Sequence, residues 1–182
     1  MKDMAKGLLV LAALFFGQQA MAADAPELKV EHSIVINATP DEVWTVAGDF
    51  NGIPRWLPTI AASRMILGKN GQVGAIRELT RQNGTKVQEK LVEYETGDEK
   101  TFTYTYVGGT VIATDYFATM TVSDAGGGKT KVVWKARFKR LAYWTDEPPE
   151  GQDDATPLNA LNKTYPLGLE NLKKVVEESA GN

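Results

Sequence analysis

The chain has 182 residues with 20 Lys and Arg against 23 Asp and Glu, a net charge of -3, and this balance excludes the basic face that nucleic-acid binding needs. It contains no cysteine and a single histidine, His32, which excludes disulfides, a thiolate nucleophile and the usual cysteine- or histidine-rich zinc site. A Ser-His-Asp triad would have to use His32. A cation site made only of carboxylates stays an alternative, but no EF-hand spacing is present, and we expect neither a metal nor a cofactor.

Residues 1–22 have the pattern of a secretory signal peptide. Two lysines precede the apolar run 7–17, and the small-residue sequence Ala-Met-Ala follows at 20–22, as at a cleavage site. The apolar run is well short of the ~20 residues that a bilayer-spanning helix needs; an uncleaved N-terminal anchor is the alternative. We therefore expect residues 1–22 to be removed on export to the periplasm, which leaves residues 23–182 as one domain without a membrane span.

The exported chain is expected to begin with a strand and a short helix. Residues 28–36 alternate apolar and polar side chains, which predicts a strand with one buried face. Thr39 then has the position of a helix N-cap, Pro40 takes the first helical position, and Glu42 completes a capping box. These residues predict a short helix over residues 43–47.

Further β-rich segments follow at intervals of roughly ten residues, separated by glycine-rich turns. They are residues 60–67, 73–81, 85–95, 101–107, 114–123 and 129–139. With the first strand they predict a meandering antiparallel sheet. After an acidic, proline-rich loop, apolar residues recur at helical spacing from Leu158 to Val176. They predict one long amphipathic helix, in which Pro166 is expected to cause a kink or a break.

This order of elements predicts an α+β fold in which a curved seven-stranded antiparallel sheet wraps around the long C-terminal helix. One helix cannot fill the concave face of a strongly curved sheet everywhere, so we expect an apolar cavity between them. The block GDFNGIPRWLPTI, residues 48–60, would place two short helices across its mouth, with Phe50 and Trp56 closing one end. Alternatively, both aromatic residues are core anchors without ligand contact.

Several motifs, taken in this order, are similar to those of a known superfamily. They are VWTVAGDFNGIPRWLP, GAIRELT with VQEKLVEY, DYFATMTV, VVWKARF and GLENLKKVVE. Over residues 28–178 the chain resembles the START/Bet v 1-like (SRPBCC) superfamily, and within it the polyketide cyclase/dehydratase branch. The resemblance implies a helix-grip fold whose cavity binds a hydrophobic small molecule or lipid. Relatives often carry histidine or lysine where this chain has Leu57.

A narrower resemblance concerns the export signal, the GDFNG sequence and the acidic loop before the last helix. In these features the chain is similar to the MxaD-type periplasmic accessory proteins of bacterial methanol oxidation. This resemblance implies assistance to electron transfer from a quinoprotein methanol dehydrogenase to cytochrome c. The acidic loop 146–154 is then either a docking patch for a basic partner or a solvated connection.

The strongest argument for a site comes from the register of one hairpin. If QNG forms a three-residue loop with Gly84 in the left-handed conformation, Leu79 faces Val87 and Arg77 faces Glu89. A two-residue Asn-Gly turn would mismatch these pairs, so we choose the first register. Arg77 and Glu89 then point inward, where unpaired charges would cost several kcal/mol each. We expect them to pair, either as an anchor for a ligand's carboxylate or carbonyl group or as a salt bridge between two strands.

Other candidate contacts come from the inward faces of the remaining elements. Tyr116 shares its face with apolar residues, so its hydroxyl needs a partner in the interior. The family resemblance implies a polar contact with the ligand at this position, and the alternative is a hydrogen bond to a backbone group. Trp134 on the last strand and Tyr165 on the long helix belong to the same interior. His32 is expected to be a packed, hydrogen-bonded core residue and not a proton shuttle. The GGGKT sequence, residues 126–130, lacks the spacing of a phosphate-binding loop and is interpreted as a hairpin turn.

Together these features predict a ligand-binding site and no catalytic residue. Its members are Phe50, Trp56, Leu57, Arg77, Glu89, Tyr116, Trp134 and Tyr165. The favoured function is a periplasmic binding or accessory protein that is not an enzyme. One alternative is a protein that acts through its surface in methanol oxidation. The other is a cyclase or dehydratase in which Glu89, Arg77 and Tyr116 serve as acid, anion stabiliser and proton donor.

Overall fold

Antiparallel strands and one long helix form the frame of the protein. The computed structural model describes residues 25–180, so the predicted signal peptide, residues 1–22, lies outside the described part. The elements are, in chain order, β1 (Leu28–Ile36), α1 (Pro40–Ala47), the 3₁₀ helix η1 (Phe50–Arg55), β2 (Ile60–Leu67), β3 (Ile76–Arg81), β4 (Lys86–Thr96), β5 (Lys100–Gly109), β6 (Thr114–Gly126), β7 (Lys129–Lys139) and α2 (Ala155–Ala180).

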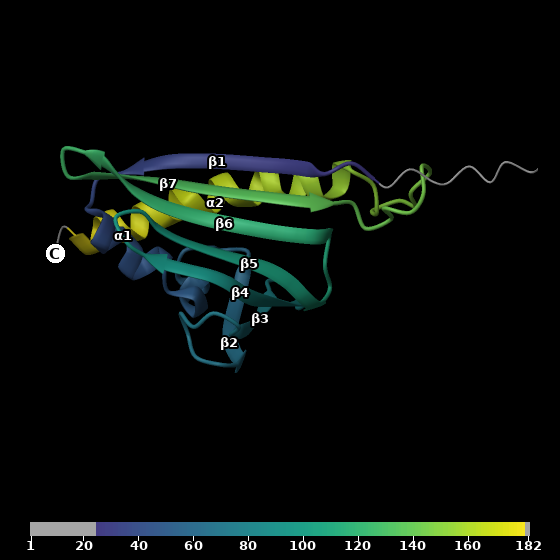
Figure 1. Ribbon diagram of the computed structural model, residues 1–182, viewed down its shortest axis with the longest axis horizontal. Helices are drawn as coiled ribbons and strands as arrows, with labels where there is room; N and C mark the ends of the chain where they lie inside the picture. The colour runs from purple at the N-terminus through teal and green to yellow at the C-terminus, as the bar shows by residue number, and fades with distance from the viewer. Residues whose placement is uncertain (1–24, 181–182) are drawn as a thin grey trace, which may run out of the picture.

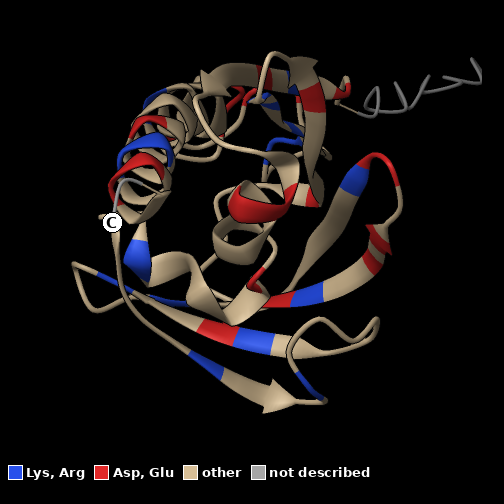
Figure 2. Cartoon of the chain, turned by 90° about the vertical axis from the view of Figure 1, so that its left-hand side faces the viewer, with Lys and Arg blue, Asp and Glu red and all other residues tan. Residues whose placement is uncertain are grey.

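The seven strands form one sheet in the order β1-β7-β6-β5-β4-β3-β2, so the first strand pairs with the last. Every neighbouring pair is antiparallel. Figure 1 shows α2 behind β1, β7 and β6, while the sheet bends away through β5 and β4 toward β2. Seen from the end, the sheet curls around the helices (Figure 2). The predicted α+β helix-grip fold is confirmed.

A capping box starts α1, as the sequence predicts. The Thr39 hydroxyl accepts the backbone N–H of Glu42 at 3.4 Å, and the Glu42 carboxylate accepts the backbone N–H of Thr39 at 2.7 Å. Pro40 takes the first helical position, where its missing N–H removes no helical bond. Gly48 ends the helix by donating its N–H to the Trp44 carbonyl at 2.8 Å. A Cβ at Gly48 would lie only 2.5 Å from the Trp44 ring, so glycine lets the chain turn at once into η1.

The hairpin between β3 and β4 has the predicted three-residue loop. Gly84 has a φ of +81°, the left-handed conformation that glycine adopts without strain. Across the two strands Arg77 pairs with Glu89, and Leu79 pairs with Val87. The register chosen from the sequence is therefore confirmed.

The start of β3 differs from the sequence prediction. Residues 73–75 belong to the connection after β2, and the Val73 side chain is 56% exposed. In this connection Gly68, Gly71 and Gly74 all have positive φ, so the chain turns there instead of extending. The prediction of a strand from residue 73 was wrong. Val73 lies in a turn, but as an apolar residue it happens to continue the apolar–polar alternation of β3.

The long helix α2 is amphipathic and covers the concave face of the sheet. Its buried side chains include Pro157, Leu161, Tyr165, Leu169, Leu172 and Val176. The helix continues through Pro166, so the expected break does not occur. A proline inside a helix costs about 3 kcal/mol. Burial of the apolar row on both sides of Pro166 offsets this cost, because packing supplies most of a helix's stability in a folded protein.

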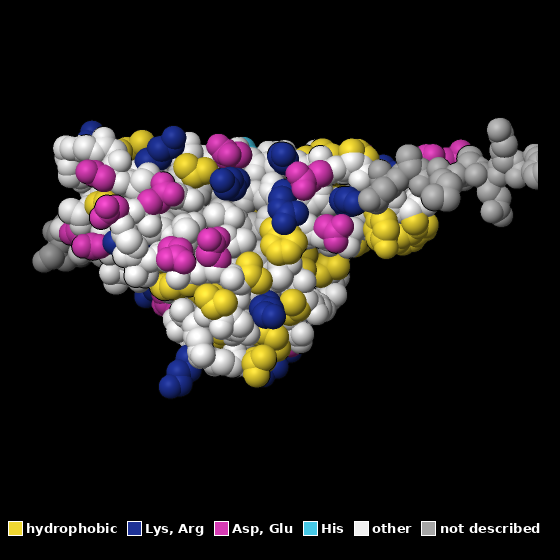
Figure 3. Space-filling view, viewed as in Figure 1, with side chains coloured by type: hydrophobic (Ala, Val, Ile, Leu, Met, Phe, Trp, Pro, Cys, Tyr) yellow, Lys and Arg dark blue, Asp and Glu magenta, His cyan; other side chains and the backbone are white. Residues whose placement is uncertain are grey.

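The outward face of β1, β7 and β6 carries charges of both signs, with scattered hydrophobic side chains among them (Figure 3). Lys29 and Arg137 both pair with Glu27, and Lys139 pairs with Asp115. Because the signs are mixed, this face presents neither a basic nor an acidic field. Within residues 25–180, no helix is both long enough and apolar enough to span a bilayer.

Candidate ligand-binding site

A cavity of about 330 Å³ lies between the concave face of the sheet, η1 and α2. Apolar side chains form much of its wall, among them Ile53, Leu57, Leu79, Val87 and Leu161. Aromatic side chains form most of the rest, namely Tyr104, Tyr106, Tyr116, Trp134 and Tyr165. The volume is at the low end of the ~300–1,000 Å³ that is typical of small-molecule sites. The hollow that the curvature of the sheet predicts is therefore present.

One end of the cavity reaches the surface. The lining residues Thr59, Arg81, Ile112, Ala160 and Thr164 are partly exposed, and we call them the mouth. The deeper lining residues are nearly all buried. The mouth thus lies between the start of β2, the end of β3, the loop between β5 and β6, and the first half of α2.

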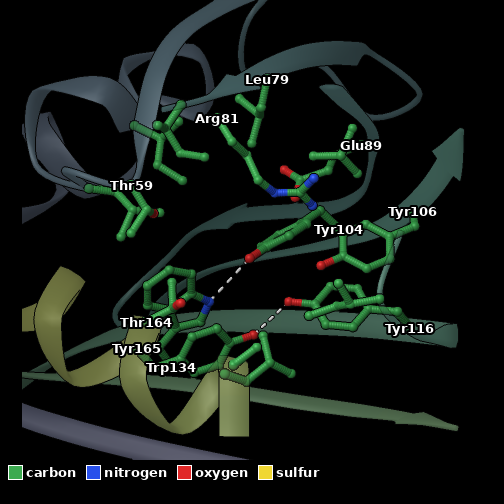
Figure 4. Close-up of a pocket in the computed structure, with 17 residues that line it drawn as sticks. Thr59, Leu79, Arg81, Glu89, Tyr104, Tyr106, Tyr116, Trp134, Thr164 and Tyr165 are labelled. Atoms are coloured by element: carbon green, nitrogen blue, oxygen red, sulfur yellow. Dashed lines mark hydrogen bonds between the residues drawn. The ribbon is translucent and has the colours of Figure 1, made fainter. Parts of the chain in front are cut away.

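Tyrosine hydroxyls converge in the middle of the cavity (Figure 4). The hydroxyl oxygens of Tyr116 and Tyr165 are 2.6 Å apart. The indole N–H of Trp134 donates to the Tyr104 hydroxyl at 3.2 Å. The partner of Tyr116 is therefore a side chain of α2, and not the backbone group that the sequence analysis gave as one alternative.

Ring stacking holds these aromatic side chains in place. The rings of Tyr106 and Tyr116 stack with centroids 3.9 Å apart and an interplanar angle of 6°. Trp134 and Tyr165 stack with the same separation and angle. Each stack joins two elements, β5 with β6 and β7 with α2. The positions of the Tyr116 and Tyr165 hydroxyls are consequently fixed before a ligand arrives, which lowers the entropy cost of binding.

Burial keeps the tyrosine hydroxyls neutral. It raises the pKa of Tyr104 above the ordinary value of 10.0 and raises the pKa values of Tyr116 and Tyr165 well above it. The physical cause is that a phenolate loses its hydration in the interior. Each of these hydroxyls therefore keeps its proton at physiological pH and can donate one hydrogen bond.

Arg77 and Glu89 form a buried ion pair at the cavity wall. Arg77 Nε and Nη2 donate to Glu89 Oε2 at 2.8 and 2.6 Å, and the two side chains are 2% and 6% exposed. The guanidinium carbon also lies 3.9 Å from the centroid of the Phe50 ring, and Nη1 donates to the Phe50 carbonyl. Glu89 lines the cavity, whereas Arg77 lies behind it. The cavity thus contains a carboxylate whose charge Arg77 already balances.

The structure places the predicted site residues in two groups. Leu57, Glu89, Tyr116, Trp134 and Tyr165 line the cavity, whereas Phe50, Trp56 and Arg77 pack behind its wall. Trp56 contacts Trp134 edge to face with ring centroids 5.5 Å apart. Leu57 makes its part of the wall apolar.

Two lining tyrosines, Tyr104 and Tyr106, were missed by the sequence analysis. The segment TFTYTYV, residues 101–107, places both of them on the same face as Phe102. Phe102 and Tyr104 are buried. The alternation within this strand was therefore a signal that could have identified them.

Gly168 allows α2 to approach the cavity wall closely. A Cβ at this position would lie 2.9 Å from both Leu57 Cδ1 and Trp134 Cζ3, closer than carbon atoms pack. The absence of a side chain on α2 therefore leaves room for two of the lining residues.

The single histidine lies outside the cavity. His32 Nε2 is 2.8 Å from Asn162 Oδ1, which links β1 to α2. The predicted hydrogen bond is confirmed, but His32 is partly exposed and not a core residue. Within residues 25–180, no group of three His, Asp or Glu side chains is arranged to hold a metal ion.

Comparison with known proteins gives a family and several similar structures. Residues 27–177 match the sequence profile of the family described as polyketide cyclase / dehydrase and lipid transport. The structure of XoxI from Bacillus cereus is similar with a TM-score of 0.67 at 23% identity, over 84% of this chain and 97% of that chain. A protein from Thermobifida fusca gives 0.64 at 26% identity, over 82% and 93%. The Zhui aromatase/cyclase from Streptomyces sp. R1128 gives 0.70 at 15% identity, over 85% and 96%. The comparison with curated proteins gives no match.

Proposed function

Because the chain belongs to the polyketide cyclase / dehydrase and lipid transport family, within the START/Bet v 1-like superfamily, we propose that it binds a small, mostly apolar molecule in its cavity. The cavity of about 330 Å³ with aromatic and aliphatic walls supports this proposal. Burial of apolar ligand surface there supplies the binding free energy, at roughly 25 cal/mol per Å². The volume favours a compact molecule or a fragment of a lipid over a whole lipid.

The test uses native mass spectrometry of the purified protein and titration with N-phenyl-1-naphthylamine, a neutral apolar fluorescent probe. A probe concentration 100 times the Kd would stabilise the protein by about 2.7 kcal/mol, seen as a rise in Tm. Absence of both a co-purified ligand and a Tm shift would contradict the proposal.

A pair of variants on α2 locates the binding site. Ala160 lines the mouth, whereas its neighbour Asn159 is exposed to solvent. Ala160→Phe is expected to fill the mouth and weaken probe binding, and Asn159→Phe is the matched control that leaves it unchanged. Wild-type affinity in Ala160→Phe would place the probe outside the cavity.

As a second function, we propose that the protein acts in the periplasm through its surface and assists electron transfer from a quinoprotein alcohol dehydrogenase to cytochrome c. The loop after β7 supports this proposal. Its residues Asp146, Glu147 and Glu150 are exposed. Next to them, Tyr143 and Trp144 are 42% and 59% exposed and contact each other edge to face. Acidic groups around exposed aromatic rings suit a basic protein partner.

Charge reversal tests this second function. Asp153 and Asp154 are left intact, because Asp153 accepts the Thr156 backbone N–H at 2.8 Å and Asp154 pairs with Arg140 at 3.3 Å. Changing Asp146, Glu147 and Glu150 to lysine is expected to slow electron transfer at low salt, because electrostatic steering is lost.

The matched control reverses Asp98 and Glu99, which are exposed in the turn between β4 and β5. We expect this control to leave the rate unchanged. If both sets of reversals gave the wild-type rate, the loop would have no part in docking.

The enzymatic alternative is a cyclase or dehydratase that acts on a ligand in the cavity. It is favoured by the position of Glu89 and Tyr116, which both line the cavity. In this mechanism Glu89 would first have to take up a proton to serve as the acid, which would free Arg77 to stabilise the developing anion, and Tyr116 would be a second proton donor. Substitution Glu89→Gln tests the enzymatic alternative. If turnover survives this substitution, Glu89 is not the acid.

A further inference from the structure

The hydrogen-bond inventory of the tyrosines identifies what the ligand must offer. Each tyrosine hydroxyl has one proton to donate and can also accept. The hydroxyl oxygens of Tyr116 and Tyr165 are 2.6 Å apart. Only one of their two protons can lie between these oxygens, so the other proton is left to donate elsewhere. The Tyr104 hydroxyl accepts the Trp134 N–H, so its own proton is also left to donate.

At least one proton stays available in every arrangement of these hydroxyls. In one arrangement Tyr104 donates to Tyr116 and Tyr116 donates to Tyr165. The series of hydrogen bonds that starts at the Trp134 N–H then ends at Tyr165, whose proton stays free. If Tyr165 instead donates to Tyr116, the protons of Tyr116 and Tyr104 are both free to be donated to a ligand. The hydroxyls point into the cavity (Figure 4). The interior therefore has an excess of donors directed at the space that a ligand would occupy.

The charges near the tyrosine hydroxyls oppose a fully anionic acceptor there. The cationic lining residue Arg81 lies at the mouth, where its Nη1 donates to the Thr110 carbonyl at 2.9 Å. Burial opposes a phenolate at Tyr116 or Tyr165, and the same loss of hydration would oppose a ligand carboxylate at that place. Glu89 adds a negative charge to the wall, and the guanidinium of Arg77 is already bound to it. A neutral oxygen acceptor avoids both costs.

We propose that the cavity recognises a neutral carbonyl oxygen, which accepts one hydrogen bond from the Tyr116–Tyr165 pair, at whichever hydroxyl keeps its proton free, and a second from the Tyr104 hydroxyl where its proton is free. This inference rests on the proposed binding function and specifies its ligand class: a compact, mostly apolar ketone, ester or amide. Apolar walls supply the affinity, and the converging hydroxyls orient the polar end. Because the stacks hold the Tyr116 and Tyr165 rings in position, the donors need no rearrangement to bind.

The experiment compares two probes of nearly equal shape, 2-acetylnaphthalene and 2-isopropenylnaphthalene, which differ only in C=O against C=CH₂. Their Kd values are measured by quenching of tryptophan fluorescence. We expect the ketone to bind roughly ten-fold more tightly to the wild-type protein, the value of one well-made buried hydrogen bond. In the double variant Tyr116→Phe/Tyr165→Phe, which keeps both ring stacks, this preference should fall to less than about three-fold.

The control is Tyr94→Phe, because the Tyr94 hydroxyl donates to the Gly48 carbonyl and not into the cavity. It is expected to keep the ten-fold preference. As a second readout, the infrared carbonyl band of ¹³C-labelled 2-acetylnaphthalene should shift to lower frequency in the wild-type protein, and less in the double variant. If the double variant does not fold, Tyr165→Phe alone is used, with a partial loss expected.

The outcomes separate this inference from the function on which it rests. If neither probe binds, the proposed binding function fails. If both bind equally and the carbonyl band does not shift, binding stands but the carbonyl inference is wrong. If the ketone preference persists in the double variant, the Tyr116–Tyr165 pair is not the donor and the carbonyl inference is wrong.

Discussion

Replacing Arg77 with methionine would leave the Glu89 carboxylate buried without its counter-ion. The wild-type pair has N–O distances of 2.8 and 2.6 Å, and both side chains are nearly inaccessible to solvent. Breaking such a pair from one side costs about 3–5 kcal/mol. The Phe50 carbonyl also loses its donor, which places the effect in the upper part of that range.

The assay is urea unfolding followed by tryptophan fluorescence. At an m-value of about 2 kcal/mol/M, Arg77→Met should lower the urea midpoint by about 2 M. The double variant Arg77→Met/Glu89→Leu should recover most of this loss, because an apolar pair avoids the desolvation of both charges. Only the Phe50 carbonyl then stays without its donor.

Arg64 provides the matched control. Its side chain is 66% exposed where it pairs with Glu78 at 2.9 Å, and an exposed pair contributes about 0.2–1 kcal/mol. Arg64→Met should therefore shift the midpoint by less than about 0.5 M. If Arg77→Met were as mild as this control, or if the double variant were no better than the single one, the argument from a buried, mutually dependent pair would be refuted.

Three further predictions follow from the local geometry. Lys86 and Arg64 hold the pKa of Glu78 at about 2, below its ordinary value of 4.5. The stability that this carboxylate contributes above pH 4.5 is therefore lost as the pH falls toward 2. In Glu78→Gln the free energy of unfolding should depend less on pH across that window, and an unchanged pH dependence would contradict this. Gly168→Val should lower the free energy of unfolding by about 1–3 kcal/mol through overpacking. It should also weaken probe binding, because Leu57 and Trp134, which the new side chain would displace, line the cavity. Unaltered probe binding would refute the close approach of α2. Thr39→Ala should cost about 1 kcal/mol by removing the capping box, measured as a lower urea midpoint, and an unchanged midpoint would show that the cap is not needed.

The fold and one part of the site could be predicted because they depend on short-range chemistry. The capping box at Thr39 and the left-handed Gly84 are decided by residues within a few positions of each other. Once the hairpin loop is known, strand pairing sets Arg77 opposite Glu89 without further information. Strand alternation likewise indicates which side chains of β7 face inward, including Trp134.

Other features depend on contacts between distant parts of the chain. Val73 matched the strand pattern but lies in a turn, and Pro166 suggested a break that α2 does not have. In both places a local preference was outweighed, by glycines that turn the chain near Val73 and by burial of the helix around Pro166. Periodicity alone contains neither effect.

By itself, the amino-acid sequence determined the class of fold, the register of the Arg77–Glu89 pair and the apolar character of the interior. Only the tertiary structure decided that Tyr116 of β6 meets Tyr165 of α2, and that Arg77 lies behind the cavity while Glu89 lines it. Side-chain direction along a strand or helix repeats with a fixed period and can be read locally. The distance and angle between a helix and a sheet depend on the packing of all the side chains between them, and these set the shape of the cavity and the hydroxyls that meet inside it.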